Sequence, residues 1–591
     1  MIKVSDYIAK RLREHYNATH FFMVSGGGAM HLNDSLGRSL PYTANHHEQA
    51  CAIAAEGFAR VGQQLAVVNV TTGPGGLNCL NGVFGQWTDS APVLYLSGQV
   101  KFSTCLASCE VPGLRQLGDQ EVDIVTSVRH LTKYAVMVTD PLDVKYHLDR
   151  AVFEATHGRF GPVWLDVPMN VQGAMVEESE LREFTPPEQP VYDLQIARVT
   201  AELQQARHPL IVAGHGIRLA DQIPLFRELV ERLNVPVVTT FNGFDLMESD
   251  APHFAGRIGT VGQRCANFTL QNADCVLFLG TRNNIRQVSY NWENFASRAC
   301  KIIVDIDPAE LAKPLVSPDI AVHADLRDFL PALAQALPGP IGSQEWFDFS
   351  INLRRKYSFE HTAEYQQQPG APINVYHFIH TLTAQMAEGD IMTAANGSAC
   401  VCLHQAGVVK KDQRIFWNSG DASMGYDLPS AIGAQYAAPS RRVVCLAGDG
   451  SIMMNLQELQ TLRHNNLPIK LFVICNDGYA SIKQTQNNFF SGHRTGSCSG
   501  SGVSVPDFRE LAQAFGLPSV RITEADALET SVREVLAADG PVLCEVMCET
   551  DYAFTPKLSA RKLPDGSMVS PSLEDMFPFL DREEYAANLI E

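Results

Sequence analysis

The fold is indicated most clearly by two neighbouring stretches, Val443-Val-Cys-Leu-Ala-Gly-Asp-Gly-Ser451 and Lys470-Leu-Phe-Val-Ile-Cys-Asn-Asp-Gly478. Each begins with a short apolar run and ends in glycine and oxygen-bearing side chains. Apolar runs of this length between helical segments are typical of strands buried on both faces of a parallel sheet. Because ligands bind outside the carboxyl ends of such strands, both stretches end where a bound group is expected.

The residues at these two strand ends form a set of hard oxygen donors. Asp449 offers a carboxylate, Asn476 an amide oxygen and Gly478 a backbone carbonyl. Such donors suit Mg²⁺, which keeps water and phosphate oxygens as its other ligands. A Gly-Asp-Gly triplet alone is equally typical of a simple turn. A diphosphate can approach the backbone closely at the small residues of this turn, Gly448, Gly450 and Ser451.

Similar apolar runs recur along the chain, at residues 21–24, 65–70, 93–96, 210–213, 275–279 and 302–305. Two stretches rich in Pro, Glu, Gly or Gln, residues 177–193 and about 338–372, have the composition of connectors; the second is expected to contain a helix over 346–357. We therefore predict three doubly wound α/β domains with parallel sheets, over residues 1–175, 192–337 and 370–591.

Composition narrows the classes of function. The 591 residues are 45% hydrophobic and 19% charged, with a net charge of −19, which argues against a nucleic-acid partner. No apolar stretch reaches the ~18 residues of a membrane span, and the N-terminus lacks the apolar core of a signal peptide, so we expect a cytoplasmic protein. Fourteen cysteines without repeated Cys-x-x-Cys pairs do not indicate a zinc site or a disulfide framework.

The first block carries further glycine-rich and polar segments. His46-His-Glu-Gln-Ala50 opens a helix of small residues; taken alone, Glu48 is a first-turn acid that complements the helix dipole. Gly26-Gly-Gly28 follows an apolar run, so the backbone there turns sharply or passes near a ligand. Downstream come Thr72-Gly-Pro-Gly-Gly-Leu-Asn78, Gly118-Asp-Gln-Glu121 and Gly161-Pro-Val-Trp-Leu-Asp-Val-Pro168.

Together these motifs resemble the thiamine diphosphate (ThDP) enzymes, and over nearly the whole chain the resemblance is closest to the acetohydroxyacid synthase (acetolactate synthase) family. The family motif is Gly-Asp-Gly followed after about 25 residues by Asn-Asn; Cys475 replaces the first Asn, and Asn476 matches the metal-binding second one. The resemblance implies that Mg²⁺ binds Asp449, Asn476 and Gly478. It implies ThDP contacts at Gly448, Gly450, Ser451, Gly73 and Asn78.

The resemblance also assigns the reacting centre. Glu48 would donate a proton to N1′ of the ThDP pyrimidine, stabilising the imino tautomer whose nitrogen removes the thiazolium C2 proton. Such proton transfer contributes roughly 10²–10⁴-fold, and burial beside the cofactor would raise the pKa of this carboxyl. Gln120 and Gly28 are placed at the same centre. In Gly420–Pro429, which alone is equally typical of an apolar helix start, Met424 would wedge ThDP into its bent form and the Ala422 carbonyl would accept from its 4′-amine.

The middle block poses the question of FAD. Three strand ends resemble the FAD contacts of acetohydroxyacid synthase and predict a structural flavin with no net redox role; the contact residues are Gly214, Gly216, Gly280, Arg282, Asp305 and Asp307. The first of these elements is a weak dinucleotide motif, because Leu219 stands at its third glycine position. Many ThDP enzymes keep this domain empty, so a flavin-free relative is the alternative.

Departures from the family concern the second substrate. Thr485 replaces a bulky Trp, Ser481 replaces a Met, and Asp119 replaces a Phe, which enlarges and polarises the acceptor pocket. Ile482 stands where pyruvate decarboxylase relatives carry a Glu, which disfavours simple decarboxylation. We expect transfer of a two-carbon acetyl unit from pyruvate, or a related 2-keto acid, to a carbonyl acceptor larger than pyruvate. A keto-sugar nucleotide, as in the flavoenzymes of yersiniose-type branched-sugar synthesis, is the favoured acceptor.

Three alternatives remain: an ordinary acetolactate synthase making 2-acetolactate from two pyruvates, another 2-keto acid decarboxylase, and an inactive regulatory protein with the same fold. Loss of Glu48, Asp449 or Asn476 would have supported the last, and all three are present. The resemblance further implies a homodimer or homotetramer with each active site at a subunit interface.

Overall fold

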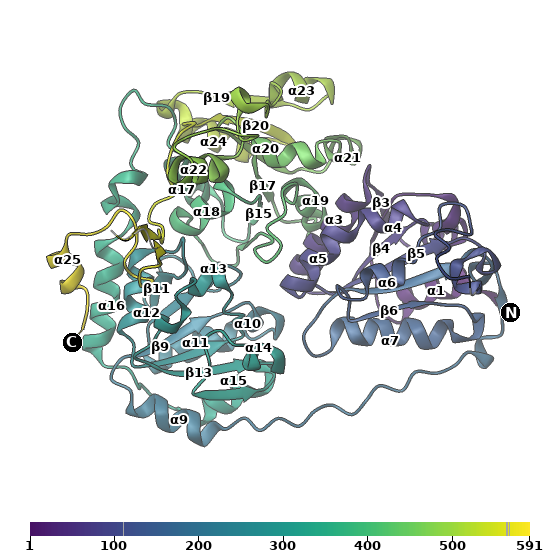
Figure 1. Cartoon of the computed structure of the whole chain (residues 1–591), viewed down its shortest axis with the longest axis horizontal. Coiled ribbons are helices and arrows are strands. Elements are labelled where there is room, and N and C mark those ends of the chain that lie inside the picture. The colour runs from purple at the N-terminus through teal and green to yellow at the C-terminus, as the bar shows by residue number, and fades with distance from the viewer. Residues whose placement is uncertain (110, 563–564, 566–567, 591) are drawn as a thin grey trace.

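The computed structural model of the chain describes residues 1–109, 111–562, 565 and 568–590 (Figure 1). In this described part, three six-stranded parallel sheets follow one another along the chain. The prediction of three doubly wound α/β units is confirmed. Each apolar run that predicted a strand forms one, with ends that move by three residues at most. No helix among the described residues combines the length and the apolar character needed to cross a bilayer.

The N-terminal sheet has the order β3-β2-β4-β5-β7-β6. Its strands are β2 (Phe21–Met23), β3 (Tyr42–Ala44), β4 (Ala66–Val70), β5 (Val93–Gln99), β6 (Tyr134–Met137) and β7 (Val163–Pro168). The helices of this unit are α1 (Val4–Glu14), α2 (Met30–Ser39), α3 (Glu48–Gly62), α4 (Pro74–Asn78), α5 (Leu80–Asp89), α6 (Ile124–Val128), α7 (Val144–Thr156) and α8 (Met169–Gln172). A short antiparallel pair, β1 (Ile2–Lys3) with β8 (Met175–Val176), joins the two ends of the unit.

The central sheet has the different order β11-β10-β9-β12-β13-β14. Its strands are β9 (Pro209–Ala213), β10 (Val237–Thr239), β11 (Phe254–Arg257), β12 (Cys275–Leu279), β13 (Cys300–Asp305) and β14 (Ile320–His323). Its helices are α9 (Ile196–Gln205), α10 (Gly216–Leu219), α11 (Ile223–Leu233), α12 (Arg264–Asn272), α13 (Ile285–Val288), α14 (Pro308–Ala312) and α15 (Leu326–Ala336). This order is that of dinucleotide-binding folds, whose ligands lie where the strand order reverses, here between β9 and β12.

The C-terminal sheet, in the order β16-β15-β17-β18-β20-β19, repeats the N-terminal topology. Its strands are β15 (Ile391–Ala394), β16 (Arg414–Phe416), β17 (Val443–Gly448), β18 (Lys470–Cys475), β19 (Ser519–Ile522) and β20 (Val542–Met547). Its helices are α17 (Val375–Gln385), α18 (Ser398–Ala406), α19 (Asp427–Ala437), α20 (Asp449–Ile452), α21 (Glu458–His464), α22 (Ala480–Phe489), α23 (Phe508–Ala514) and α24 (Ala525–Ala537). A tail with β21 (Arg561–Lys562), β22 (Met568–Val569) and α25 (Arg582–Ala587) follows.

The two predicted connectors differ in structure. Residues 181–195 form no helix or β-strand and run as a long extended segment between the N-terminal and central units (Figure 1). The second contains α16 (Gln344–Lys356), where the sequence predicted a helix. This helix packs on the central unit, because Trp346 is buried and its indole N–H donates to the Pro209 carbonyl at 2.8 Å.

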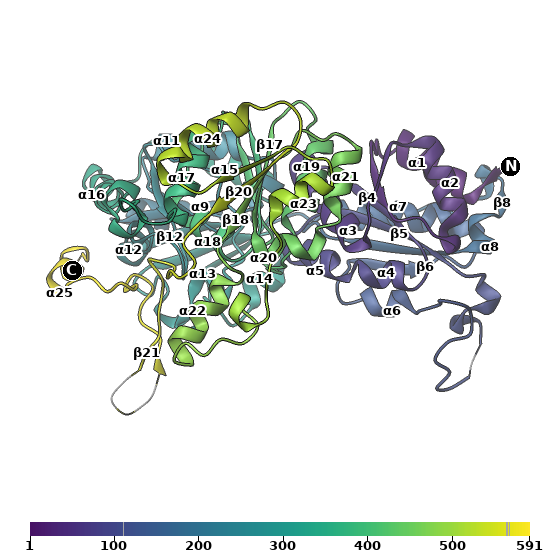
Figure 2. The same cartoon turned by 90° about the horizontal axis from the view of Figure 1, so that it is seen from above.

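The N-terminal and C-terminal units meet through α3 and α19, which lie side by side in both views (Figures 1 and 2). Glycine is required at this crossing: a Cβ on Gly433 would lie 1.8 Å from the Ala54 carbonyl oxygen, and one on Gly57 would lie 2.2 Å from that of Ser430. The small residues that marked α3 in the sequence are explained by this close packing. The helix that begins at Glu48 is therefore held rigidly against the C-terminal unit.

Candidate active site

The ends of β17 and β18 are joined by the Asp449 carboxylate. Asp449 is 1% exposed, and its Oδ2 accepts from the backbone N–H groups of Asn476 at 2.9 Å and Gly478 at 3.1 Å. Burial raises the pKa of Asp449, while these backbone hydrogen bonds oppose the increase. The three predicted metal ligands thus lie together at one edge of the sheet.

The side chain of Asn476 is oriented by two hydroxyl groups. Its Nδ2 donates to Tyr552 Oη at 2.9 Å and to Ser398 Oγ at 3.2 Å, which directs Oδ1 away from both. The backbone carbonyl of Asn476 accepts from Lys483 Nζ at 2.7 Å. The sequence reasoning missed Ser398, Lys483 and Tyr552, which come from separate segments and belong to no motif.

The donor set suits magnesium. No group of three or more His, Cys, Asp or Glu side chains in metal-binding range occurs among the described residues. The candidate site instead combines one carboxylate with an amide oxygen and a carbonyl oxygen. Mg²⁺ is held by few protein ligands of this kind and takes its remaining oxygens from water and phosphate. Gly478 has φ +92°, and a Cβ there would lie 2.6 Å from the Ser497 carbonyl oxygen, so glycine is required in this turn.

The turn that carries Ala422 and Met424 is bound to the same edge. The Gly425 N–H donates to Ser451 Oγ at 2.9 Å, and Ser451 Oγ donates to Asp427 Oδ2 at 2.6 Å. Ala422 is exposed with φ +59°, and Met424 is half-buried. Two motifs about 25 residues apart in the sequence, residues 420–429 and 448–451, are therefore in direct contact.

A second group of predicted residues gathers in the N-terminal unit. Glu48 is the first residue of α3 and is half-buried; Asn78 Nδ2 donates to its carboxylate at 2.9 Å. A Cβ on Gly75 would lie 3.7 Å from Glu48 Oε1. The helix start is capped by the His47 ring, whose Nδ1 accepts from the Gln49 N–H at 3.1 Å. Glu48 is thus held at the surface of this unit beside the glycine-rich segment 72–78.

Gly28, Gly73 and Gln120 lie against the same turn. The Gly28 N–H donates to Thr71 Oγ1 at 3.1 Å. A Cβ on Gly73, which has φ +64°, would lie 2.0 Å from the Gln120 carbonyl oxygen. Gln120 is exposed and has φ +61°. Within the part of the chain that the structure describes, no hydrogen bond or ion pair connects these N-terminal residues to Asp449 or Asn476, so the predicted site consists of two separate halves.

The predicted acceptor residues divide between the two halves. On α22, Ile482 is 45% exposed and Thr485 lies one turn further on the same face. Thr485 Oγ1 donates to the Ser481 carbonyl at 3.0 Å, and Ser481 Oγ would be 3.6 Å from a Cβ on Gly397. Asp119 is exposed in the N-terminal unit, next to Gln120. Because the Thr485 hydroxyl already has an acceptor, its contribution is mainly the space left by a small side chain.

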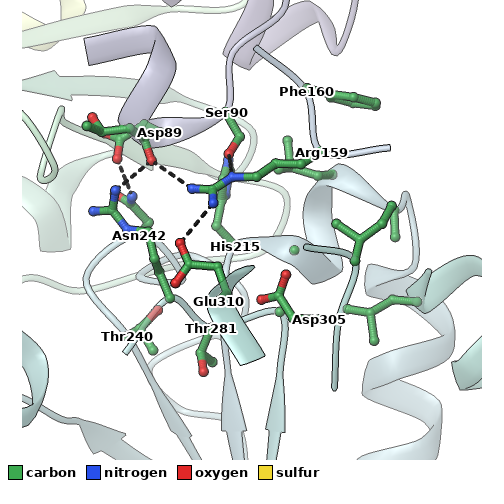
Figure 3. A pocket seen from close by; sticks show the side chains of 18 of the residues that line it. Asp89, Ser90, Arg159, Phe160, His215, Thr240, Asn242, Thr281, Asp305 and Glu310 are labelled. Carbon is green, nitrogen blue, oxygen red and sulfur yellow. Dashed lines mark hydrogen bonds and ion pairs between the residues drawn. The ribbon is translucent and has the colours of Figure 1, made fainter. Parts of the chain in front are cut away.

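The carboxyl edge of the central sheet forms a cavity with about 1030 Å³ of space, its open mouth included (Figure 3). Of the predicted flavin contacts, Gly216, Gly280, Arg282 and Asp305 line it. Gly214 lies behind them, where a Cβ would be 2.2 Å from the Gly280 carbonyl oxygen. Asp307 lines an adjoining cavity instead. Burial raises the pKa of Asp305 to about 7.

Other walls of this cavity come from the N-terminal unit and were missed from the sequence. Arg159 donates to Glu310 at 2.8 Å, and its Nε donates to Ser90 Oγ at 3.0 Å (Figure 3). It also donates to Asp307 at 2.8 Å. The Arg282 guanidinium reaches the Thr88 carbonyl at 2.7 Å. Only the packing of the units brings these residues together, and no spacing in the sequence signals it.

Three family models match consecutive parts of the chain. "Thiamine pyrophosphate enzyme, N-terminal TPP binding domain" matches residues 2–126, the central domain of the same enzymes matches 196–333, and the C-terminal TPP binding domain matches 395–546. The acetolactate synthase isozyme 2 large subunit of Escherichia coli (strain K12) is 30% identical over 89% of this chain and 92% of its own length. Acetolactate synthase 1, chloroplastic, of Zea mays is 31% identical over 92% and 85%. The chain belongs to the acetolactate synthase-like family of ThDP enzymes.

The predicted membership of this family is confirmed, and with it the class of protein: a ThDP-dependent carboligase or decarboxylase. The matched segments contain both halves of the site. Glu48 lies in the N-terminal TPP binding domain, and Asp449 and Asn476 lie in the C-terminal one. For this acetolactate synthase-like enzyme, the residues at the ends of β17 and β18 have the donor groups that a metal-bound diphosphate requires.

Proposed function

We propose that the enzyme decarboxylates pyruvate or a related 2-keto acid and transfers the two-carbon acetyl unit to a carbonyl acceptor larger than a second pyruvate, such as a keto-sugar nucleotide. The observation that carries the proposal is the exposed face of α22. There, Ile482 and Thr485 are exposed and Ser481 is half-buried beside Gly397, so small side chains border the surface of Ile482. This face belongs to the helix that directly follows the metal-binding turn, so an acceptor on it lies next to the proposed reacting centre.

The chain's own residues have distinct roles in this proposal. Asp449, Asn476 Oδ1 and the Gly478 carbonyl would hold Mg²⁺, which would supply the positive charge that the diphosphate of ThDP needs. When bound, ThDP supplies the electron sink that stabilises the acyl carbanion. Glu48 holds a proton on its carboxyl for the pyrimidine ring, and Asn78 keeps that carboxyl in place through the 2.9 Å hydrogen bond. Tyr552 and Ser398 fix the Asn476 amide so that its oxygen faces the metal.

The test is a competition for acceptors. Purified enzyme is incubated with pyruvate, Mg²⁺, ThDP and FAD. One reaction contains no other acceptor, a second contains an equimolar keto-sugar nucleotide, and a third contains an equimolar simple bulky ketone. Products are identified by mass. We expect the adduct of the hydroxylated keto-sugar to exceed 2-acetolactate. Efficient formation of 2-acetolactate with no adduct of any bulky ketone would contradict the proposal.

Acetolactate synthesis is the second candidate. It is favoured by the similar proteins of E. coli and Zea mays, which carry that name. It requires that the space beside Thr485 is filled from elsewhere, for example by a second subunit. The same competition assay separates the two functions, because 2-acetolactate forms from pyruvate alone.

We further propose that FAD binds in the cavity of the central unit. The strand order is that of dinucleotide-binding folds, and the cavity lies at the reversal between β9 and β12. Its lining contains guanidinium groups for a diphosphate, on Arg159, Arg282 and Arg286, and the Asp305 carboxyl at the end of β13 for ribose hydroxyls. Absorbance near the flavin bands after exhaustive dialysis tests the proposal. Protein that carries no flavin and takes up none would refute it.

A homodimer, or a tetramer of two such dimers, is proposed as the active form. No hydrogen bond or ion pair among the described residues joins Glu48 to Asp449 or Asn476. Several large apolar side chains of the N-terminal and C-terminal units are at least one-third exposed: Leu77, Phe84, Trp87, Met453 and Met454. Burying such side chains against a second copy is favourable. Sedimentation that shows an active monomer of 64.9 kDa would contradict the proposal.

A further inference from the structure

A second large cleft lies between the central unit, the segment after α16 and the C-terminal tail, with about 1950 Å³ of space including its open mouth. It is distinct from the cavity of the central sheet, since the two share no lining residue. Five Arg and Lys side chains line it against three Glu side chains, in a chain whose net charge is −19. The cleft is therefore a local concentration of positive charge on an acidic protein.

Arg257, at the end of β11, is the most unusual of these cations. It is 1% exposed, and its guanidinium donates to the His404 carbonyl and to Ser249 Oγ, both at 3.3 Å. It also lies 4.1 Å from the centre of the Phe244 ring. Among the described residues no carboxylate pairs with it, and its Nε has no hydrogen-bond partner. Buried charges in proteins are normally paired, because desolvation of an isolated ion is costly. Two other buried arginines obey this rule: Arg60 contacts Glu56 at 3.1 Å and Arg414 contacts Asp245 at 2.9 Å.

Two further guanidinium groups in the cleft donate only to carbonyl oxygens among the residues that the structure describes. Arg264 donates to the Met576 and Pro578 carbonyls, the first at 3.0 Å. Arg354 donates to the carbonyls of Ala251 at 2.9 Å and Phe254 at 2.7 Å. Carbonyl oxygens satisfy the N–H groups but leave the positive charge in place. Consistently, burial lowers the pKa of Arg257 to about 9 and also lowers those of Arg264 and Arg354.

The acidic residues of the cleft do not neutralise this group. Glu584 binds Lys356 at 3.0 Å and accepts from the Tyr357 hydroxyl at 2.8 Å. Glu360 and Glu364 are exposed, and no ion pair among the described residues joins either of them to Arg257, Arg264 or Arg354. Glu364 and Glu584 act on Arg264 only at longer range, where their charge opposes the decrease of its pKa. The cleft also has aromatic walls, formed by Tyr357, Phe359 and Tyr365.

We propose that this cleft binds a small organic anion, whose phosphate or carboxylate groups supply the counter-charge that Arg257, Arg264 and Arg354 lack. Planar guanidinium groups match both kinds of oxyanion. The aromatic walls offer apolar contact to the remainder of the molecule. The anion connects the central unit to the C-terminal tail, to which Arg264 is bound, and to α18 of the C-terminal unit, to which Arg257 is bound.

The first experiment measures thermal unfolding of the holoenzyme with pyrophosphate, with citrate, and with sodium chloride at equal ionic strength. A ligand that binds the folded state raises the midpoint in a saturable way. We expect such a rise with at least one of the two anions. If only pyrophosphate raises the midpoint, the ligand carries phosphate groups; if only citrate raises it, the ligand carries carboxylate groups. No rise beyond that in chloride with either anion, up to saturating concentration, would overturn the proposal.

Two matched variants separate a ligand site from a structural arginine. Arg257→Met keeps the apolar stem and removes the unpaired charge, so the anion-free midpoint should stay unchanged or rise, while the anion affinity falls at least tenfold. Arg414→Met breaks a paired buried charge and should lower the midpoint without changing the anion affinity. If Arg257→Met lowers the midpoint as much as Arg414→Met and retains the anion response, the site is refuted. Arg264→Gln, on the rim of the same group, is expected to weaken anion binding as well and tests the proposal if Arg257→Met does not fold.

Discussion

The carboxyl edges of the C-terminal and central sheets carry two different kinds of site. At the C-terminal edge, the Asp449 carboxylate accepts hydrogen bonds from the backbone of Asn476 and Gly478, which lie no more than 29 positions further along the chain. At the central edge, the cavity takes its walls from all three units, including Arg159 from the first and Ser419 from the third. The first site is built by local hydrogen bonds within one unit. The second depends on how the units pack, and the two should respond differently to mutation.

The largest effect is expected from a residue at neither edge. Glu48→Gln removes the acid-base group of the N-terminal half, so pyruvate-dependent CO₂ release should fall by 10²-fold or more, while folding and ThDP binding persist. Glu180→Gln, an exposed carboxyl in the first connector, serves as the control and should have wild-type activity. More than about a tenth of the wild-type rate in Glu48→Gln would remove the basis of the proposed acid-base role.

The local character of the C-terminal edge is tested by Asp449→Ala. It should weaken ThDP and Mg²⁺ binding together, by at least tenfold or about 1.4 kcal/mol, because in the proposed site one carboxylate both binds the metal and joins β17 to β18. Calorimetric titration measures both affinities, and FAD content should be unchanged because the central cavity does not include Asp449. Asp477→Asn, in the same turn but outside the donor set, is the matched control. Unchanged ThDP affinity in Asp449→Ala would exclude this metal site.

The acceptor face of α22 extends the C-terminal site outward. Thr485→Trp should fill the space beside Ile482 and reduce kcat/KM for a large acceptor by about tenfold or more, while pyruvate decarboxylation is spared. Thr485→Ser keeps the space open and should behave as wild type. Equal loss of both activities would mean that the position supports the reacting centre rather than acceptor choice.

The composite character of the central edge is tested by Arg159→Gln. If FAD binds there, a residue of the N-terminal unit should contribute to its affinity. Loss of the guanidinium should weaken binding by roughly 10- to 150-fold, which corresponds to the roughly 1.5–3 kcal/mol of a charged hydrogen bond. Flavin fluorescence during dialysis measures the loss. Arg198→Gln, an exposed arginine of the central unit outside the cavity, is the control. Unchanged FAD retention in Arg159→Gln would show that the N-terminal wall is not part of the site.

The smallest effect on turnover is expected from Asp305→Asn. Burial raises the folded-state pKa of Asp305 from 3.8 to about 7, so the folded state favours the neutral acid. The higher pKa in the folded state stabilises the protein below about pH 4. This stabilisation, a few kcal/mol at most, is lost as the pH rises toward 7. Asp305→Asn should remove this loss. The unfolding midpoint of the variant should therefore increase relative to that of wild type as the pH rises from 4 to 7. A pH-independent difference would show that the pKa of Asp305 is the same in the folded and unfolded states.

Sequence patterns predicted the strands well, because buried parallel strands are short apolar runs and each has a distinct end. They also placed Asp449 and Asn476 in one metal site, and the structure joins the two by a hydrogen bond. The hydrogen bond between Asn78 and Glu48 was not predicted, although both residues had been singled out. The same patterns gave no role to Tyr552, Ser398 or Arg159. These residues act across long separations, and a hydrogen bond over 76 or 148 positions leaves no period or spacing to detect.

The sequence by itself determined the three α/β units and the ThDP family, and it supplied the predicted residues of each half-site, because strand ends and turn glycines are local features. The tertiary structure decided what these features become together. It placed the small residues of α3 against α19, formed a cavity from three units, and left Arg257 buried without a carboxylate. Packing and desolvation depend on neighbours that are distant in sequence, and they appear only when the chain is folded.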